Sequence, residues 1–101
     1  MRIFVDVDGT MTTEDRRGAP PSTEMIDRVK ALIAAGHAIV VWSQRGKRYA
    51  RHFCEEHGIK AEAYMGKPAM FVDDWPSLRR TGIPTVSPKA FLAMEIEGME
   101  I

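Results

Sequence analysis

Residues 3–10, Ile-Phe-Val-Asp-Val-Asp-Gly-Thr, join a short apolar run to a turn-prone pair and carry two aspartates. The β-branched and aromatic run Ile3–Val5 predicts a strand, and Asp8-Gly9 predicts the turn that ends it. A continuous apolar run of this kind suits a strand that is covered on both faces, as in a parallel sheet. The stretch therefore predicts a buried strand with Asp6 and Asp8 at its carboxyl end.

Helices and further strands are predicted to alternate along the rest of the chain. The expected helices run from a cap at Ser22 or Thr23 to Gly36, over Lys47–His57 with Gly58 as terminator, and from Ser87-Pro88 to about Glu97. The expected strands cover residues 38–42, 61–65, 70–73 and 84–86, with a short helical turn from Pro76 to Gly82. Such alternation is typical of βαβ units with right-handed crossovers. The chain is therefore predicted to be an α/β protein with a mainly parallel central sheet.

The connection between the third and fourth apolar runs is short. Only Gly66–Ala69 separate residues 61–65 from residues 70–73, whereas a parallel crossover normally needs a dozen or more residues. Residues 61–65 are therefore expected to form either an edge strand or an extended arm outside the regular topology.

The composition is that of one globular domain over residues 1–101, with 45% hydrophobic and 28% charged residues. Because 14 basic residues balance 14 acidic ones, no net charge points to nucleic acid or to an anionic membrane. The single cysteine, Cys54, excludes an internal disulfide, favours a reducing compartment and is expected in the core. The N-terminus does not resemble a signal peptide, and no apolar run approaches the roughly 20 residues needed to cross a bilayer. We therefore expect a cytoplasmic protein with no membrane partner.

Chemically useful side chains follow several of the predicted strands where those strands end. They are Asp6, Asp8, Ser43, Lys67, Asp73 and Asp74. In an open parallel sheet, ligands bind beyond the carboxyl ends of the strands. Carboxylates, a hydroxyl and an ammonium group could therefore converge at one edge of the sheet.

These residue types suit the transfer of a phosphoryl group. A phosphate monoester repels a carboxylate nucleophile, and Mg²⁺, a hard cation that prefers oxygen ligands, would offset that repulsion. Asp6 could bind this ion and attack phosphorus to give an aspartyl-phosphate. Asp8, on the same side of the strand, could protonate the leaving oxygen and then deprotonate a water. Ser43 and Lys67 would hold the remaining phosphoryl oxygens.

Residues beside this set are expected to bind the substrate. Gly9 lets the backbone turn close to the substrate, where amide N–H groups can hold phosphoryl oxygens. Thr10, Gln44 and Arg45 adjoin the same strand ends and are counted with them. Arg45 and the basic residues that follow it either attract an anionic substrate or form a solvated basic turn.

Four motifs, in this order along the chain, resemble those of the haloacid dehalogenase superfamily. Asp6-Val7-Asp8-Gly9-Thr10 looks like the first motif, and Val40-Val41-Trp42-Ser43 resembles the second. Gly66-Lys67-Pro68 is similar to the third, and Phe71-Val72-Asp73-Asp74 looks like the fourth, an acidic metal-binding pair. The resemblance thus covers most of the chain.

The resemblance implies a Rossmann-like three-layer sandwich and phosphoryl transfer through Asp6. It also implies Mg²⁺ held by the Asp6 carboxylate, the Asp8 main-chain carbonyl and an acid of the fourth motif, with the choice between Asp73 and Asp74 open. The loops after the first and second motifs are too short for a folded cap domain. The chain therefore resembles the smallest, capless members of the superfamily.

Two other families begin with similar residues and fit less well. A calcium-binding EF-hand loop needs Gly at its sixth position and Glu at its twelfth, whereas this chain has Gly9 fourth and Arg17 twelfth. In a receiver domain the lysine follows the acidic residues, whereas Lys67 precedes Asp73. Taken alone, Ser43 would be a helix cap and Lys67 a solvated loop lysine. Their place in the motif order favours the phosphate-binding interpretation.

The sequence therefore predicts a phosphatase that requires Mg²⁺ and hydrolyses a phosphomonoester. Without a cap the site is open unless a second copy covers it, so a homo-oligomer is one of the arrangements left open. Since no basic stripe with interleaved aromatic residues is present, a phosphorylated small molecule is favoured over a nucleic-acid end or a phosphoprotein. The alternatives are a non-catalytic or regulatory phosphate-binding domain and a phosphotransferase with another acceptor.

Overall fold

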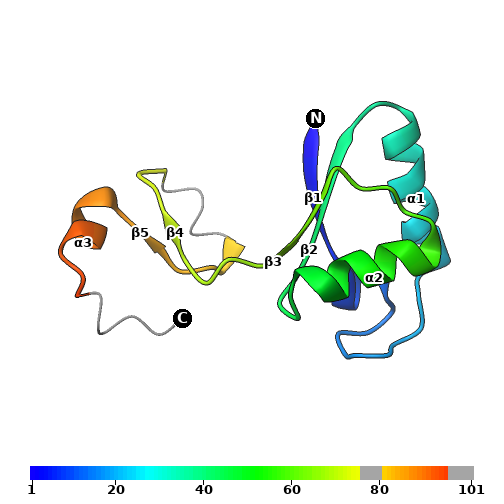
Figure 1. The fold of residues 1–101 in the computed structure, drawn as a ribbon, viewed down its shortest axis with the longest axis horizontal. Coiled ribbons are helices and arrows are strands. Elements are labelled where there is room, and N and C mark those ends of the chain that lie inside the picture. The colour runs from blue at the N-terminus through cyan, green and yellow to red at the C-terminus, as the bar shows by residue number, and fades with distance from the viewer. Residues whose placement is uncertain (76–80, 96–101) are drawn as a thin grey trace. The chain divides into compact units, whose positions relative to one another are not determined.

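The computed structural model describes residues 1–75 and 81–95. The chain divides into two compact units, Met1–Lys67 and Pro68–Ile101. Figure 1 labels the helices and strands of both units. The prediction of one domain over residues 1–101 stays a prediction.

The first unit is built on a three-stranded parallel sheet. Its strands are β1 (Arg2–Asp6), β2 (Ala38–Ser43) and β3 (Ala63–Gly66), in the order β1-β2-β3. The register pairs Asp6 with Trp42 and Ser43 with Gly66. The open question about residues 61–65 is thereby answered, because β3 is an edge strand bonded to β2. The ends of all three strands lie at one edge of the sheet, which brings Asp6, Ser43 and the residue after Gly66 together.

Two helices connect these strands. Helix α1 (Thr23–Ala34) begins after Ser22, whose Oγ accepts a hydrogen bond from the Met25 N–H at 3.3 Å. Helix α2 (Lys47–His57) has the predicted bounds and ends at Gly58, which takes the left-handed conformation with φ 68°. Both connections are the crossovers that a parallel sheet requires.

The core of the first unit lies on one face of the sheet, beneath both helices. It is one cluster of apolar side chains from β1, β2, the helices and the loops, which includes Val5, Ile39, Val41, Ile26, Val29, Phe53 and Cys54. Cys54 is fully buried, as expected, and burial raises the pKa of its thiol to about 11.

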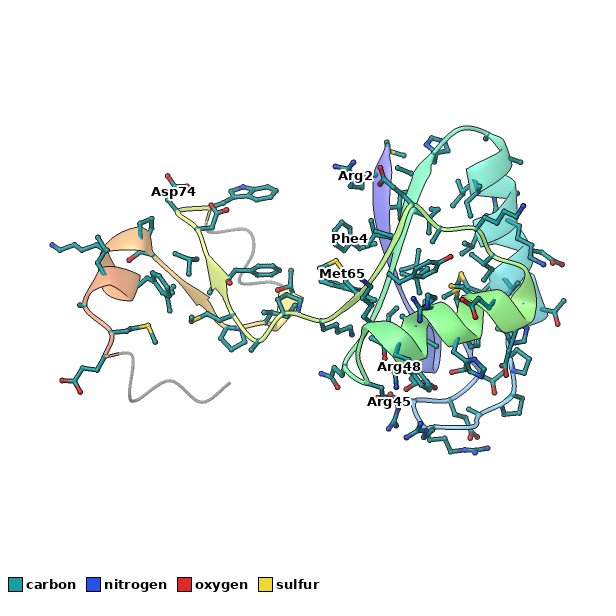
Figure 2. The ribbon with its side chains drawn as sticks, in the orientation of Figure 1. Arg2, Phe4, Arg45, Arg48, Met65 and Asp74 are labelled. Atoms are coloured by element: carbon teal, nitrogen blue, oxygen red, sulfur yellow. The ribbon has the colours of Figure 1, made fainter. Side chains whose placement is uncertain are left out.

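The opposite face of the sheet is also apolar. Phe4 and Trp42 form an edge-to-face pair with ring centroids 5.0 Å apart, and Phe4 and Met65 remain exposed. Figure 2 shows Phe4 and Met65 on the side of the sheet away from α1 and α2. The strands of the first unit are thus apolar on both faces, whereas its helices cover only one.

A wide turn follows β1 directly. This turn, η1 (Val7–Met11), is closed by the Thr12 N–H, which donates to the Val7 carbonyl at 3.1 Å. Asp8 and Gly9 leave helical geometry inside it, and Gly9 has φ 81°. The predicted Asp8-Gly9 turn is confirmed, and the chain here coils around the end of β1.

The second unit contains a short parallel pair and a short helix. Strands β4 (Phe71–Val72) and β5 (Thr85–Val86) pair in parallel, and helix α3 (Pro88–Leu92) begins after the Ser87 cap. The helix predicted to reach about Glu97 ends at Leu92, and the strand predicted over residues 70–73 has only two residues. The helical turn predicted from Pro76 to Gly82 falls largely on residues 76–80, outside the described residues.

The structure is therefore a mixed α/β protein with parallel strands, which confirms the predicted class. The main sheet has three strands within the described residues. In the same part of the chain, residues 1–75 and 81–95, no helix has the length and apolar character needed to span a membrane.

Candidate functional site

Asp6 lies at the carboxyl end of β1 and contacts two polar side chains. The Lys67 Nζ is 3.1 Å from Asp6 Oδ1, and the Thr10 hydroxyl donates to Asp6 Oδ2 at 3.4 Å. The side chains of Asp6 and Lys67 are each a quarter exposed. The carboxylate is therefore paired with a cation but still open to a ligand from solvent.

Lys67 is positioned by the end of β2. Its N–H donates to the Ser43 carbonyl at 2.9 Å, and its Nζ lies 5.8 Å from the centroid of the Trp42 ring. Ser43 is 2% exposed, and its Oγ accepts from the Arg45 N–H at 3.0 Å. The hydroxyl proton of Ser43 stays available to a ligand oxygen, because the bond to Arg45 uses Oγ only as an acceptor.

Asp8 is held through both of its carboxylate oxygens. The Tyr49 hydroxyl donates to Asp8 Oδ1 and the Arg45 Nε donates to Asp8 Oδ2, each at 2.6 Å. The bond to Asp8 is the main cause of the raised pKa of Arg45. The pKa of Tyr49 is raised first by burial and then by its bond to Asp8. At neutral pH, Tyr49 and Arg45 are therefore both hydrogen-bond donors that fix the rotamer of Asp8.

Gly9 allows the tight turn that separates Asp6 from the following loop. Its N–H donates to Thr12 Oγ1 at 3.0 Å and to the Glu14 carbonyl at 3.1 Å. A Cβ atom at position 9 would lie 3.2 Å from Cβ of Asp15, in addition to the positive φ. The Gly9 N–H is thus used inside the loop in this structure.

A polar cavity of about 330 Å³ joins these groups into one candidate site. Its lining combines three carboxylates with two cations and two neutral polar side chains. The lining residues are Asp6, Asp8, Asp15, Ser43, Gln44, Arg45 and Lys67. All four of the predicted catalytic residues lie at this cavity, together with Gln44 and Arg45, while Gly9 and Thr10 belong to the adjoining turn.

Asp73 and Asp74 belong to the second unit, where they follow β4. The Asp73 N–H donates to the Val86 carbonyl at 3.0 Å, and Asp73 Oδ1 accepts from the Trp75 N–H at 2.9 Å. Asp73 thus ends the parallel pair and caps the next turn. The assignment of either aspartate as a metal ligand stays a prediction.

Two residues of the cavity region were not predicted from the sequence. Asp15 lies in the polar loop after η1, and Tyr49 lies in the first turn of α2. The only sequence signal for Tyr49 was its place in the helix that follows Ser43, where a side chain of the first turn can point back to the strand ends. No sequence pattern indicated that Asp15 would line the cavity, because its position depends on how the loop after η1 folds back.

The donor set of the cavity fits a hard divalent cation in its chemistry. Carboxylate oxygens and main-chain carbonyls are the ligands that Mg²⁺ prefers. Within residues 1–75 and 81–95, however, no three His, Cys, Asp or Glu side chains are grouped closely enough to hold a metal by themselves. A metal in this cavity would be held by carboxylates together with other oxygen ligands, such as a carbonyl, water or substrate oxygen.

Comparisons with protein-family models, with curated proteins and with solved structures found no match. The function of the chain is therefore inferred from its own residues.

Proposed function

We propose that this protein is a phosphatase of the haloacid dehalogenase superfamily type, which hydrolyses a small phosphomonoester in the cavity around Asp6. The observation that carries the proposal is the pairing of Asp6 at the end of β1 with Lys67 after β3, on either side of β2 and its terminal Ser43. A carboxylate that is partly exposed and paired with a cation can meet a phosphate, because the cation offsets the charge of the incoming group.

In the first half of the reaction, an Asp6 oxygen attacks phosphorus, and the bond from phosphorus to the ester oxygen breaks. Lys67 and Ser43 donate to the non-bridging oxygens, where negative charge collects. The leaving oxygen takes a proton from Asp8, and this yields an alcohol and the aspartyl-phosphate. In the second half Asp8 takes a proton from water, whose oxygen attacks phosphorus. The bond from phosphorus to the Asp6 oxygen then breaks, which releases phosphate and regenerates the Asp6 carboxylate.

Asp8 must gain a proton before it can act as an acid. In the structure it accepts hydrogen bonds from Tyr49 and Arg45, an arrangement that suits a carboxylate base. Arg45 is exposed and also lines the cavity, so an incoming phosphate is expected to compete with Asp8 for its guanidinium. That exchange would free one Asp8 oxygen to carry the proton.

Mg²⁺ is the cofactor that the chemistry of the site favours. Asp6, the Asp8 carbonyl and either Asp73 or Asp74 are the proposed ligands, and the ion would supply positive charge between carboxylate and phosphate. The choice of Asp73 or Asp74 rests on the resemblance of Phe71-Val72-Asp73-Asp74 to the fourth motif of the superfamily.

A finer fold is proposed along with this function, the Rossmann-like three-layer sandwich without a cap. Its support is the apolar face of the sheet opposite α1 and α2, where Phe4 is 46% exposed. Strands that are apolar on both faces are typical of sheets covered on both faces. A layer on this second face would bury Phe4, Trp42 and Met65.

A second candidate function is a phosphate-binding domain without turnover. The observation that favours it is that Asp6 and Asp8 are both engaged by cations, which could make the site a static anion receptor once those cations are shared with a ligand. It predicts phosphate binding that does not depend on a free Asp6 carboxylate.

The two candidates are separated by a turnover assay on a panel of phosphomonoesters with Mg²⁺ and with EDTA. The phosphatase proposal predicts metal-dependent release of phosphate, loss of turnover in Asp6→Asn and a fall of roughly 10²–10⁴-fold in Asp8→Asn. Asp27→Asn, which alters an exposed aspartate on α1, is the matched control and should leave the rate unchanged. Metal-independent activity, or full activity of Asp6→Asn, would contradict the mechanism.

A further inference from the structure

A second cavity, of about 380 Å³, lies beside the candidate active site and shares Arg45 with it. Its lining is dominated by guanidinium groups from α2 and from the loop before α1. The lining residues include Arg17, Arg45, Arg48, Tyr49, Arg51 and Glu55. Figure 2 shows Arg45 and Arg48 at the same end of the first unit, beside the start of α2.

The second cavity carries an excess of positive charge. Arg45 pairs with Asp8, and Arg51 lies 3.6 Å from Glu55. Among the described residues, neither Arg17 nor Arg48 forms an ion pair with a carboxylate. Two exposed guanidinium groups in one cavity are therefore left to bind an anion from solvent.

Arg17 is held at this cavity by the fold of its loop. The Thr13 N–H donates to the Pro20 carbonyl at 2.9 Å, and the Ser22 N–H donates to the Met11 carbonyl at 2.8 Å. Ala19 is buried beneath the loop. These contacts tie the two arms of the loop together, so that Arg17 has a defined place against α2.

The aromatic ring in the second cavity is covered by cations. The guanidinium carbon of Arg17 lies 5.6 Å from the centroid of the Tyr49 ring, and that of Arg45 lies 5.9 Å from it. The Tyr49 hydroxyl is already bonded to Asp8. The cavity therefore offers a ligand guanidinium donors around a ring that two cations already contact, which suits a phosphate group better than a stacked base.

We propose that the second cavity binds a second phosphate group of the substrate, while the first phosphate is hydrolysed at Asp6. This inference rests on the proposed function and names its substrate class, a phosphomonoester that carries a further phosphate. Arginine binds phosphate through paired N–H donors, and a water takes up about 30 Å³, so the cavity has room for a phosphate and several waters. Arg45, between the two cavities, contacts both ends of such a substrate.

The second phosphate could belong to a small bisphosphate or to the neighbouring nucleotide of a nucleic-acid end. Both present the same group to Arg17 and Arg48. A matched pair of substrates is therefore used for each source: a sugar bisphosphate against the sugar monophosphate, and a 5′-phosphorylated dinucleotide against the nucleoside 5′-monophosphate.

The test compares kcat/KM within each pair for the native protein and for the double variant Arg17→Gln/Arg48→Gln. The native protein should prefer the doubly phosphorylated member of at least one pair by on the order of tenfold. The double variant should lose most of that preference, since glutamine keeps a polar side chain with N–H donors but neither the charge nor the paired donor geometry of arginine. Arg28→Gln, which alters an exposed arginine on α1, is the control and should retain the native preference.

A binding measurement separates failure of this inference from failure of the phosphatase proposal. Calorimetry with the Asp6→Asn variant should give tighter binding of the doubly phosphorylated ligand, and adding Arg17→Gln/Arg48→Gln should abolish the difference. This result would support the subsite even if native protein turned over no substrate. Equal affinities for singly and doubly phosphorylated ligands, or a preference that survives in the double variant, would overturn the inference.

Discussion

Asp8 has its two carboxylate oxygens fixed by two different elements, Arg45 from the turn after β2 and Tyr49 from α2. A general acid and base must be aimed at the reacting oxygen, and a residue that is bonded on both oxygens keeps one rotamer. Tyr49 is therefore a positioning residue in this account. Its ring, partly buried beside Arg17 and Arg45, also lines the second cavity.

The raised pKa of Tyr49 has a measurable effect on the stability of the protein at high pH. Burial and the bond to Asp8 both raise the pKa of Tyr49. The phenol form is thus favoured in the folded state, and its contribution to stability is present below the pKa of free tyrosine, about 10. That contribution is lost as the pH rises through the higher folded-state pKa.

The measurement is an ultraviolet absorbance titration of native protein minus that of Tyr49→Phe, which isolates Tyr49 from Tyr64. We expect a midpoint above about 10, the value for free tyrosine, while circular dichroism shows that both proteins remain folded. A midpoint at or below that of free tyrosine would contradict the assigned environment. In a turnover assay, Tyr49→Phe should lower kcat more than it raises KM, since the phenol acts through Asp8 and not on the substrate.

At the scale of elements, the helices and strands of the first unit follow from local sequence signals. Lys47–His57 was predicted with its observed bounds, and Gly58, predicted to end it, takes the left-handed conformation there. The end of β1 was predicted because Asp8-Gly9 cannot continue a strand. In this unit, the element bounds that glycine terminators and apolar periodicity predicted were not changed by tertiary packing.

The second unit departs from its prediction for physical reasons. Helix α3 buries none of its residues and ends at Leu92, which is 85% exposed. A short helix gains most of its stability from packing an apolar face, so periodicity alone does not extend it. Strand β4 can be no longer than its partner β5, which lies between Pro84 and the Ser87 cap of α3.

The cap of α1 gives a prediction at this scale. Ser22→Ala removes the Oγ that accepts from the Met25 N–H, and should lower the free energy of unfolding by about 1 kcal/mol. Thr23→Ala is the matched control. It also removes an exposed hydroxyl, but Thr23 is the first residue of the helix and not its cap. Urea unfolding followed by circular dichroism measures both. Equal losses in the two variants would argue against Ser22 as the cap.

At the scale of the whole molecule, part of the candidate site could be predicted and part could not. The convergence of Asp6, Ser43 and Lys67 follows from the parallel sheet, whose strands all end at one edge. Asp15, Tyr49 and Arg17 could not be found in the same way. They reach the site from a loop and from a helix face, and their approach depends on how those elements pack on the sheet.

The two cavities differ in the charged groups that line them. The first cavity holds Asp6 and Asp8, whereas the second holds Arg17 and Arg48, for which no ion pair with a described carboxylate is formed. A chain with no net charge therefore concentrates positive charge where an anionic substrate would approach.

The central claim is that Asp6 becomes phosphorylated during turnover. The most direct measurement is rapid acid quenching of the protein with Mg²⁺ and a substrate identified by the panel, followed by mass spectrometry of the peptide that contains Asp6. We expect one added phosphoryl group on Asp6, a longer-lived adduct in Asp8→Asn, which lacks the base for hydrolysis, and none in Asp6→Asn. Turnover without any adduct in Asp8→Asn, or an adduct on another residue, would contradict the account.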